Sequence, residues 1–480
     1  MAMAATRSID DLPGPPRLPL LGNIHQMVLP ARAWRVHLTA ERWSERYGPI
    51  FRFDVGSRRM VTISDADAIN TILRDRPDGF RRWSEQEAIF HEMGIDGVFS
   101  AEGADWKRQR ALVVRALNSN HLQRYFHVVH TATERLYRQL AGATRDGREV
   151  DIAEELSSYT VDVTSALAFG YDLNTLEHRD NELQEHIQRV FSMIMWRVSA
   201  PFPYWRWVKL PADRRLDRSV AELHRAVAGF IEQARERMRR RPELVESPEN
   251  FLEGMLAAQQ AEGTFTDEEI IGNTLTLLTA GEDTTSHTLG WTLWYLSTRP
   301  EMQDRLAQEA CEILGEQRFP AEHEQLGVMH YGEAVLKESM RLKPAAVANL
   351  AEPLQDTTLC GTRIPADTRL WMLTRHAGLL ASEVERANEF DPQRWLGDDG
   401  GEQDAPDQKS FLAFGAGPRF CPGRNLAFLE AKSALAMIVR NFRIDPDPSS
   451  GPVTEQLRLA LVPHGLRVRL RERTPQNQHS

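Results

Sequence analysis

The sequence predicts a mainly α-helical fold with small β-sheets. From about residue 104 to about residue 314, apolar residues recur at intervals of three and four in nearly every segment, which is typical of helices that bury one face. One of these helices is far longer than the others. Two short runs, residues 50–53 and 60–63, are rich in β-branched and aromatic side chains and are typical of paired strands.

Size and composition place the chain among ordinary globular proteins. It has 480 residues, a formal net charge of -10 and 41% hydrophobic residues, values that fit neither a disordered nor a membrane-embedded chain. The acidic balance disfavours binding to nucleic acid, because clustered lysine and arginine are needed to hold a phosphate backbone. We find no repeat or low-complexity linker, so we expect a flexible N-terminal tail over residues 1–11 and a single domain over residues 12–480.

Cysteine content and the start of the chain bear on location. Cys311, Cys360 and Cys421 are too few and too scattered for a disulfide framework or a paired-cysteine zinc site, so a reducing compartment fits best. Residues 1–11 are polar and lack the apolar core of a secretory signal or a membrane span. We therefore expect a cytoplasmic monomer without a membrane anchor.

Local signals give the other elements in order. Residues 12–19 hold too many prolines for a helix or a central strand, which predicts an extended arm. A helix is expected at about residues 34–46, and short strands are expected within residues 357–373. A last helix is expected at residues 424–440, directly after a turn-rich loop.

The longest predicted helix has a clear start and end. Thr266 followed by Glu269 is a capping box, apolar periodicity continues to about Ser297, and Pro300 ends it. About 30 residues at about 1.5 Å per residue make about 45 Å, so this helix must cross the molecule. Its middle, residues 281–287, is too polar for a membrane span, and buried polar groups are costly unless they have a function.

Residues 414–423 join the turn-rich loop to the last helix. A cysteine just before a helix N-terminus meets unpaired N–H groups and the positive end of the helix dipole, which lower its pKa and favour the thiolate that a metal needs. We expect Gly417 to let the backbone approach a flat ligand closely and Phe414 to shield the sulfur of Cys421. An isolated cysteine is more often a core residue, but here the whole pattern Phe-x-x-Gly-x-Arg-x-Cys-x-Gly is present.

That pattern resembles the haem-ligand segment of the cytochrome P450 family. The resemblance implies a P450 fold in which haem b lies between the long central helix and the cysteine loop with the last helix, with Cys421 as the axial ligand of the iron. In the central helix it implies that the small residues Ala280 and Gly281 leave room for dioxygen. It also implies that Asp283 relays protons from water and that Thr284 controls hydrogen bonding.

Three further motifs share this resemblance. Glu338 and Arg341 match the family's Glu-x-x-Arg pair, and Arg394 would complete that pair into a structural network. Residues 106–110 resemble the family's Trp-x-x-x-Arg element. The resemblance implies that the haem propionates are held by three residues, namely Trp106, Arg110 and Arg419. Many relatives also carry an arginine or histidine about ten residues after the pair, but residues 342–351 contain neither.

The family resemblance predicts a soluble, bacterial-type monooxygenase of secondary metabolism without a fused reductase. It would hydroxylate or epoxidise a small hydrophobic substrate with O2, and a ferredoxin or flavodoxin with its NAD(P)H reductase would supply electrons. The donor would dock near Lys107, Arg108 and Arg424. The substrate pocket is expected among four apolar side chains, namely Phe90, Ile95, Val98 and Val347, under a roof formed by residues 196–207.

Three alternatives remain open at this point. A peroxygenase or isomerase of the same haem-thiolate type needs no proton relay, which the Asp283–Thr284 pair disfavours. A haem-binding sensor without turnover would release no product with any electron donor. A helical protein without haem, in which Cys421 is structural, would show no thiolate-type carbon monoxide spectrum.

Overall fold

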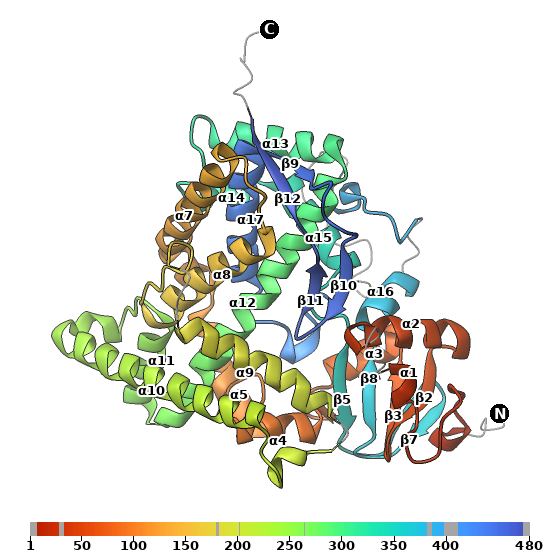
Figure 1. Ribbon diagram of the computed structural model, residues 1–480. Coiled ribbons are helices and arrows are strands. Elements are labelled where there is room, and N and C mark those ends of the chain that lie inside the picture. Colours follow the sequence, from red (N-terminus) through yellow and green to blue (C-terminus); the bar gives the residue numbers. More distant parts are fainter. Residues whose placement is uncertain are drawn as a thin grey trace.

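The computed structural model describes residues 7–27, 33–178, 182–200, 202–263, 265–381, 386–397 and 411–473. Its described part is mainly helical with small β-sheets, which confirms the predicted fold class. In Figure 1 the largest sheet lies at the lower right beside the N-terminal region, and most of the long helices lie to its left. The longest helices are α12 (Asp267–Ser297) and α10 (Pro211–Arg240).

The remaining helices follow in chain order. They are α1 (Ile24–Met27), α2 (Val36–Tyr47), α3 (Ala66–Arg74), α4 (Ser84–Glu92), α5 (Gly103–Ala116), α6 (Ser119–Arg124), α7 (Phe126–Arg145), α8 (Ile152–Phe169), α9 (Glu182–Ser199), α11 (Phe251–Glu262), α13 (Pro300–Leu314), α14 (His323–Gly327), α15 (His330–Leu342), α16 (Thr374–Ala381) and α17 (Arg424–Asn441).

Within the described residues the strands form four small sheets. They are β1 (Arg7–Ser8), β2 (Ile50–Val55), β3 (Arg58–Ile63), β4 (Phe80–Arg81), β5 (Asn349–Pro353), β6 (Thr357–Leu359), β7 (Thr362–Ile364), β8 (Arg369–Met372), β9 (Phe442–Pro446), β10 (Thr454–Leu457), β11 (Leu461–His464) and β12 (Val468–Glu472). The largest sheet has the order β2-β3-β8-β5-β4.

The expected hairpin is present at one edge of this sheet. β2 and β3 pair antiparallel with Phe53 opposite Met60. The tail expected over residues 1–11 is shorter than predicted, because Arg7 and Ser8 pair in parallel with β7. Residues 1–6 lie outside the described part of the chain.

Helix α12 has the bounds that its sequence signals predict. The Thr266 side chain accepts from the backbone N–H of Glu269, and the Glu269 carboxylate accepts from the backbone N–H of Thr266. Such a capping box satisfies two N–H groups that a helix start otherwise leaves unpaired. The helix runs through the middle of the molecule in Figure 1. None of the helices in the described part of the chain is long and apolar enough to span a membrane.

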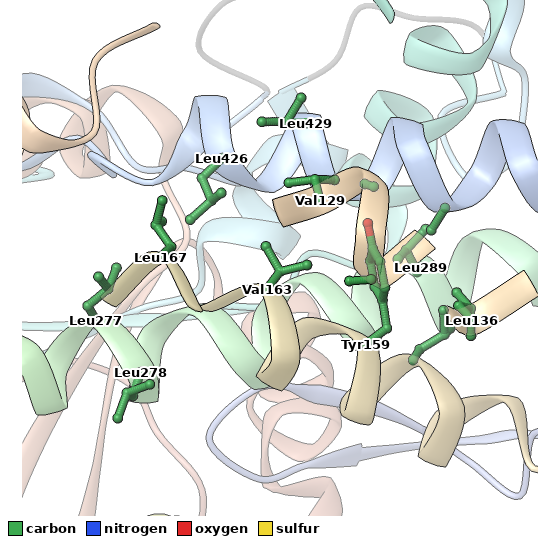
Figure 2. Close-up of a cluster of buried hydrophobic side chains, with 14 of the residues drawn as sticks. Val129, Leu136, Tyr159, Val163, Leu167, Leu277, Leu278, Leu289, Leu426 and Leu429 are labelled. Carbon is green, nitrogen blue, oxygen red and sulfur yellow. The ribbon is translucent and has the colours of Figure 1, made fainter. Parts of the chain in front are cut away.

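The core lies between α12 and three other helices. Figure 2 shows apolar side chains of α7, α8, α12 and α17 pointing into one cluster. Tyr159 of α8 is fully buried there, and its hydroxyl donates to the backbone carbonyl of Glu430 on α17 at 3.1 Å. The hydroxyl therefore has a partner although its ring is surrounded by apolar side chains. This packing holds α12 and α17 in fixed positions relative to each other.

The segment before α5 packs tightly on α12. A Cβ at Gly272 would lie 2.2 Å from the carbonyl oxygen of Asp96, and the side chain of Asn273 accepts from the N–H of Val98 at 2.8 Å. Only glycine leaves room for this backbone approach. The segment around Val98 is therefore fixed two helical turns before the polar middle of α12.

We predict that Gly272→Ala destabilises the protein, because the added methyl group would collide with backbone. Gly229→Ala is the matched control, since Gly229 lies inside α10 with no atom within 4 Å of its Cβ position. There the same change should stabilise by about 0.5–1 kcal/mol, because alanine favours helix. Chemical unfolding measures both, and equal effects of the two substitutions would contradict the packing.

Candidate functional site

The loop that carries Cys421 is closed on itself and packed against α3. The backbone N–H of Cys421 donates to the carbonyl of Phe414 at 2.9 Å. Gly417 has a φ of 69°, and a Cβ there would lie 2.5 Å from the carbonyl oxygen of Leu73. The glycine is therefore required by a left-handed backbone and by contact with the end of α3. This differs from the predicted reason, which was close approach of the backbone to a flat ligand.

Burial and nearby hydrogen-bond donors have opposite effects on the pKa of the Cys421 thiol. Burial raises the pKa of this thiol, whereas the backbone N–H groups of Gly423 and Arg424 and the charge of Arg110 lower it. Burial is the larger effect, so the expectation of a lowered pKa is wrong for the protein without a metal. A coordinating metal supplies the missing charge and deprotonates a thiol outright.

Aromatic rings surround the loop. The ring of Phe414 lies 5.7 Å from that of Phe428 and 6.3 Å from that of Phe420, measured between centroids. These rings form an apolar cluster at the cysteine loop, and shielding of the Cys421 sulfur by Phe414 stays a prediction.

Glu338 is the centre of a buried network. Arg341 donates to both of its carboxylate oxygens at 2.8 Å, and the Nε of Arg394 donates at 3.3 Å. The indole N–H of Trp395 and the backbone N–H of Asp391 also donate to it, at 2.9 and 3.0 Å. The three residues predicted for this network lie together, and Trp395 is a member that the sequence pattern did not indicate.

A second group links α5 to the cysteine loop. The guanidinium of Arg419 lies 4.6 Å from the centre of the Trp106 ring, and Arg110 donates to the carbonyl of Phe420. Arg419 also donates to the carboxylate of Glu102 at 2.5 Å. The structure thus brings together Trp106, Arg110 and Arg419, the three residues expected to hold the propionates.

Two arginines that sequence reasoning missed lie beside this group. Burial, followed by the charges of Arg76 and Arg419, lowers the pKa of Arg82 to about 9. The Nε atoms of Arg76, Arg82 and Arg419 are buried without a hydrogen-bond partner among the described residues. Unpaired buried donors on cations are costly, so this cluster fits an anionic group. Neither Arg76 nor Arg82 belongs to a sequence motif that would have identified it.

The middle of α12 presents one open face. Residues 272–279 are all buried, but Ala280 is exposed, and Asp283, Thr284 and His287 are only half-buried. These four positions are three or four residues apart and so share one side of the helix. An exposed alanine in the middle of a central helix indicates a space beside it. The hydroxyl of Thr284 donates to the carbonyl of Ala280 at 2.7 Å.

Gly281 and Glu282 face the opposite way, toward α8. A Cβ at Gly281 would lie 2.9 Å from the side chain of Thr164, so helix packing requires this glycine, and room for dioxygen was the wrong reason for it. Glu282 accepts from Ser157 at 3.2 Å, and burial together with the charge of Asp283 raises the pKa of Glu282 to about 8. Glu282 is therefore mostly protonated at pH 7.

The residues expected to line a substrate pocket have different surroundings. Phe90 and Ile95 are buried in the main core, and Val347 is buried against Trp291. All three side chains are less than 5% exposed and pack against other core residues, so we correct these three assignments. Val98 is only partly buried and stays a candidate. The expected roof includes Pro201, which lies outside the described residues.

A comparison with protein families decides what this site belongs to. The family model described as Cytochrome P450 matches residues 12–470. This chain belongs to the cytochrome P450 family. P450 enzymes bind haem b and activate O2 with electrons from a separate partner, so the protein is an oxidoreductase of the monooxygenase type.

Three of the curated proteins that this P450 resembles come from eukaryotes. It is 29% identical over 482 residues to the mitochondrial 25-hydroxyvitamin D-1 alpha hydroxylase of Mus musculus, covering 95% of this chain and 91% of that protein. It is 26% identical over 418 residues to the chloroplastic protein LUTEIN DEFICIENT 5 of Arabidopsis thaliana, covering 85% and 69%. A cytochrome P450 of Caenorhabditis elegans is 25% identical over 469 residues, covering 90% and 88%.

These relatives correct two expectations. Proteins named as mitochondrial or chloroplastic point to an organelle, so the cytoplasmic assignment is wrong. The bacterial-type qualifier is not supported either, because these three relatives come from animals and a plant.

The residues present fit haem. The donor set offers one sulfur ligand at Cys421, and the unpaired guanidinium atoms beside Trp106 suit the two carboxylates of protoporphyrin IX. The open face of α12 supplies a wall with small side chains. Residues on three elements, α5, α12 and the cysteine loop, would thus contact the cofactor.

We predict that Glu338→Ala destabilises the protein by about 3–5 kcal/mol, because Arg341 and Arg394 would keep buried charges without a partner. Glu389→Ala is the matched control. Glu389 also pairs with an arginine three residues away, Arg386 at 3.1 Å, but both side chains are exposed. Its loss should change stability by less than about 1 kcal/mol. Similar unfolding free energies for the two variants would contradict the buried network.

Proposed function

We propose that this P450 inserts one oxygen atom of O2 into a C–H or C=C bond of a small hydrophobic substrate, by hydroxylation or epoxidation. The observation that carries the proposal is the open face of α12, where Asp283 and Thr284 stand beside the exposed Ala280. A haem with a thiolate ligand supplies the oxygen activation, because the thiolate pushes electron density onto the iron and favours O–O cleavage. We assign residues 12–480 to one haem-thiolate domain.

The names of the relatives narrow the substrate class. The mouse relative is named as a hydroxylase of 25-hydroxyvitamin D. We infer a substrate of similar chemistry for this chain, a largely apolar ring compound. The partly buried Val98 is the apolar side chain of the segment before α5 that we propose contacts it.

The chain's own residues have separate tasks in this scheme. Cys421 would bind the iron, and Trp106, Arg110 and Arg419 would hold the propionates. The Asp283 carboxylate, half-buried on the open face, would exchange a proton with water and hold it on the cofactor side of the helix. The Thr284 hydroxyl, now bonded to the Ala280 carbonyl, can turn to donate a hydrogen bond at the same place.

The electron donor would be a small ferredoxin or flavodoxin with its NAD(P)H reductase. Two of the residues expected to form the docking patch already have ion-pair partners. Lys107 pairs with Asp78 at 3.2 Å, and Arg108 pairs with Glu269 of α12. Lys107 and Asp78 are both exposed, so their attraction is weak and an acidic partner can compete for the lysine. Arg108 is held in place and contributes less.

The Asp283–Thr284 pair favours a monooxygenase that uses O2 over an enzyme that uses hydrogen peroxide. A reaction that starts from hydrogen peroxide needs no proton delivery to O2, so Asp283 and Thr284 would have no task there. Peroxide-supported turnover equal to turnover with reductase and NAD(P)H would favour the second reading.

We predict that Asp283→Asn lowers NAD(P)H-supported turnover by about 100-fold, the range of general acid–base catalysis, without loss of the haem spectrum. Glu282→Gln is the matched control. Glu282 is the neighbouring acid on the other side of the helix and is mostly protonated at pH 7, so an amide mimics it. An equal loss in both variants, or none in Asp283→Asn, would overturn the assignment.

We predict that Lys107→Glu slows reduction by an acidic donor at low ionic strength, and that high salt removes the difference. Arg469→Glu serves as control because β12 lies at the opposite end of the molecule from α5 in Figure 1. Stopped-flow reduction over a salt series measures the effect. Unchanged rates and salt dependence in Lys107→Glu would remove this docking site.

A further inference from the structure

His287 lies on the open face of α12, and the proposed reaction gives it no part. It follows Thr284 by three residues and Asp283 by four, so it shares their side of the helix. Its Nδ1 atom is buried and has no hydrogen-bond partner among the described residues. A buried polar nitrogen is rarely left unpaired, because the loss of its bonds to water is costly. This atom therefore points to a hydrogen-bonding group that the chain itself does not supply.

A β-hairpin bounds the open face beyond His287. Strands β10 and β11 pair antiparallel with Leu457 opposite Leu461, so residues 458–460 form the turn between them. The indole of Trp291 donates to the Leu461 carbonyl at 2.8 Å, which places the hairpin beside α12 (Figure 1). Trp291 lies one helical turn after His287 on the same side of α12. The turn of the hairpin is therefore close to the His287 ring.

A buried ion-pair network holds this hairpin in place. The Glu455 carboxylate of β10 accepts from Arg375 at 2.9 Å, lies 2.9 Å from the Nε2 of His37 and also pairs with Lys343. His37 and Arg375 are buried, and the loss of one partner from a buried ion pair is strongly unfavourable. The wall beside His287 is therefore firmly fixed.

Burial and charge determine which group fits beside His287. Burial is the largest effect and lowers the pKa of the imidazole, while Asp283 raises this pKa and Arg458 in the hairpin turn lowers it. The ring is therefore mostly neutral at pH 7, with one nitrogen that donates and one that accepts.

The two charged side chains that act on the ring, Asp283 and Arg458, have opposite signs, so they leave no excess charge for an ionic ligand. A carboxylate beside His287 would also be repelled by Asp283. A hydroxyl group is uncharged and can both donate and accept, as the neutral ring does. It therefore matches His287 better than an anion or an alkyl group.

We propose that His287 binds a hydroxyl group of the substrate, and that the substrate is a largely apolar molecule that already carries this hydroxyl. This inference rests on the proposed function, since it requires haem beside Cys421 and a substrate on the open face of α12. The hydroxyl lies about 4.5 Å along the helix axis from Thr284, because three residues separate the two positions. His287 is then a specificity-determining residue that selects the substrate and its orientation.

The test uses three imidazole compounds that bind haem iron through the imidazole nitrogen and carry a linear side chain. The side chain ends in a hydroxyl, a methyl or a carboxylate group, and its length is varied. Titration of the loaded protein, followed by the shift of the main haem absorption band, gives each Kd. At the length where wild type most prefers the alcohol, His287→Phe should weaken alcohol binding by about 10-fold and change alkane binding by less than about 2-fold.

Two further variants separate the hydrogen bond from support of the fold. His287→Asn keeps a donor and an acceptor near the position of Nδ1, so it should recover part of the preference for the alcohol. His376→Phe is the matched control. His376 is also a buried histidine with an unpaired ring nitrogen among the described residues and a pKa that burial lowers, but it belongs to α16. Its loss should leave the preference for the alcohol unchanged.

Two results would overturn the proposal. One is an unchanged preference for the alcohol in His287→Phe, which is expected if an internal water is the partner of His287. The other is tighter binding of the carboxylic acid than of the alcohol to wild type, which would indicate an anion site at Arg458. Failure of the proposed function would look different, because no compound would then shift the haem spectrum of wild type.

Discussion

The buried carboxylate of Glu338 is the interaction on which the geometry of the site depends. It binds Arg341 on its own helix and fixes Trp395 from a later segment. The Trp395 ring lies 5.0 Å from that of Phe411, and the Phe411 ring lies 6.4 Å from that of Phe414. The carbonyl of Phe414 in turn accepts from the N–H of Cys421. A chain of contacts therefore runs from the Glu338 carboxylate to the backbone N–H of Cys421. Burying an unpaired charge costs several kcal/mol, so arrangements in which Glu338, Arg341 or Arg394 lose their partners are strongly disfavoured. The position of the cysteine loop depends on this network through the contacts above.

The opposite wall of the site depends on packing rather than on charge. Helix α12 is held against α8 and α17 by the core of Figure 2, and Gly281 lets it approach α8 closely. With that side occupied, the positions at Ala280, Asp283 and Thr284 must face the other way. Asp283 and Thr284 therefore lie on the open side of a buried helix, whereas Glu282 lies on the packed side, where burial raises its pKa to about 8.

Most of the fold was predictable because its signals are local. The capping box at Thr266 and the last helix beginning at Arg424 depend only on neighbouring residues, and the structure has both where the sequence indicates them. The motif residues could also be named, since their spacing is characteristic of a family. The position of Arg82 beside Arg419 could not, because it depends on a strand pairing with a segment some 270 residues later in the chain. Likewise the sequence shows that Phe90 is apolar, but only the packed structure shows that it belongs to the core.

The central claim is that the Cys421 thiolate binds the iron of haem b, and the reduced carbon monoxide difference spectrum tests it most directly. The account predicts the shifted band of a thiolate-ligated haem for the wild-type protein and its loss in Cys421→Ala. Cys360→Ala, which removes another half-buried cysteine, should keep the band. A wild-type spectrum without the shifted band, or a band that persists in Cys421→Ala, would contradict the account.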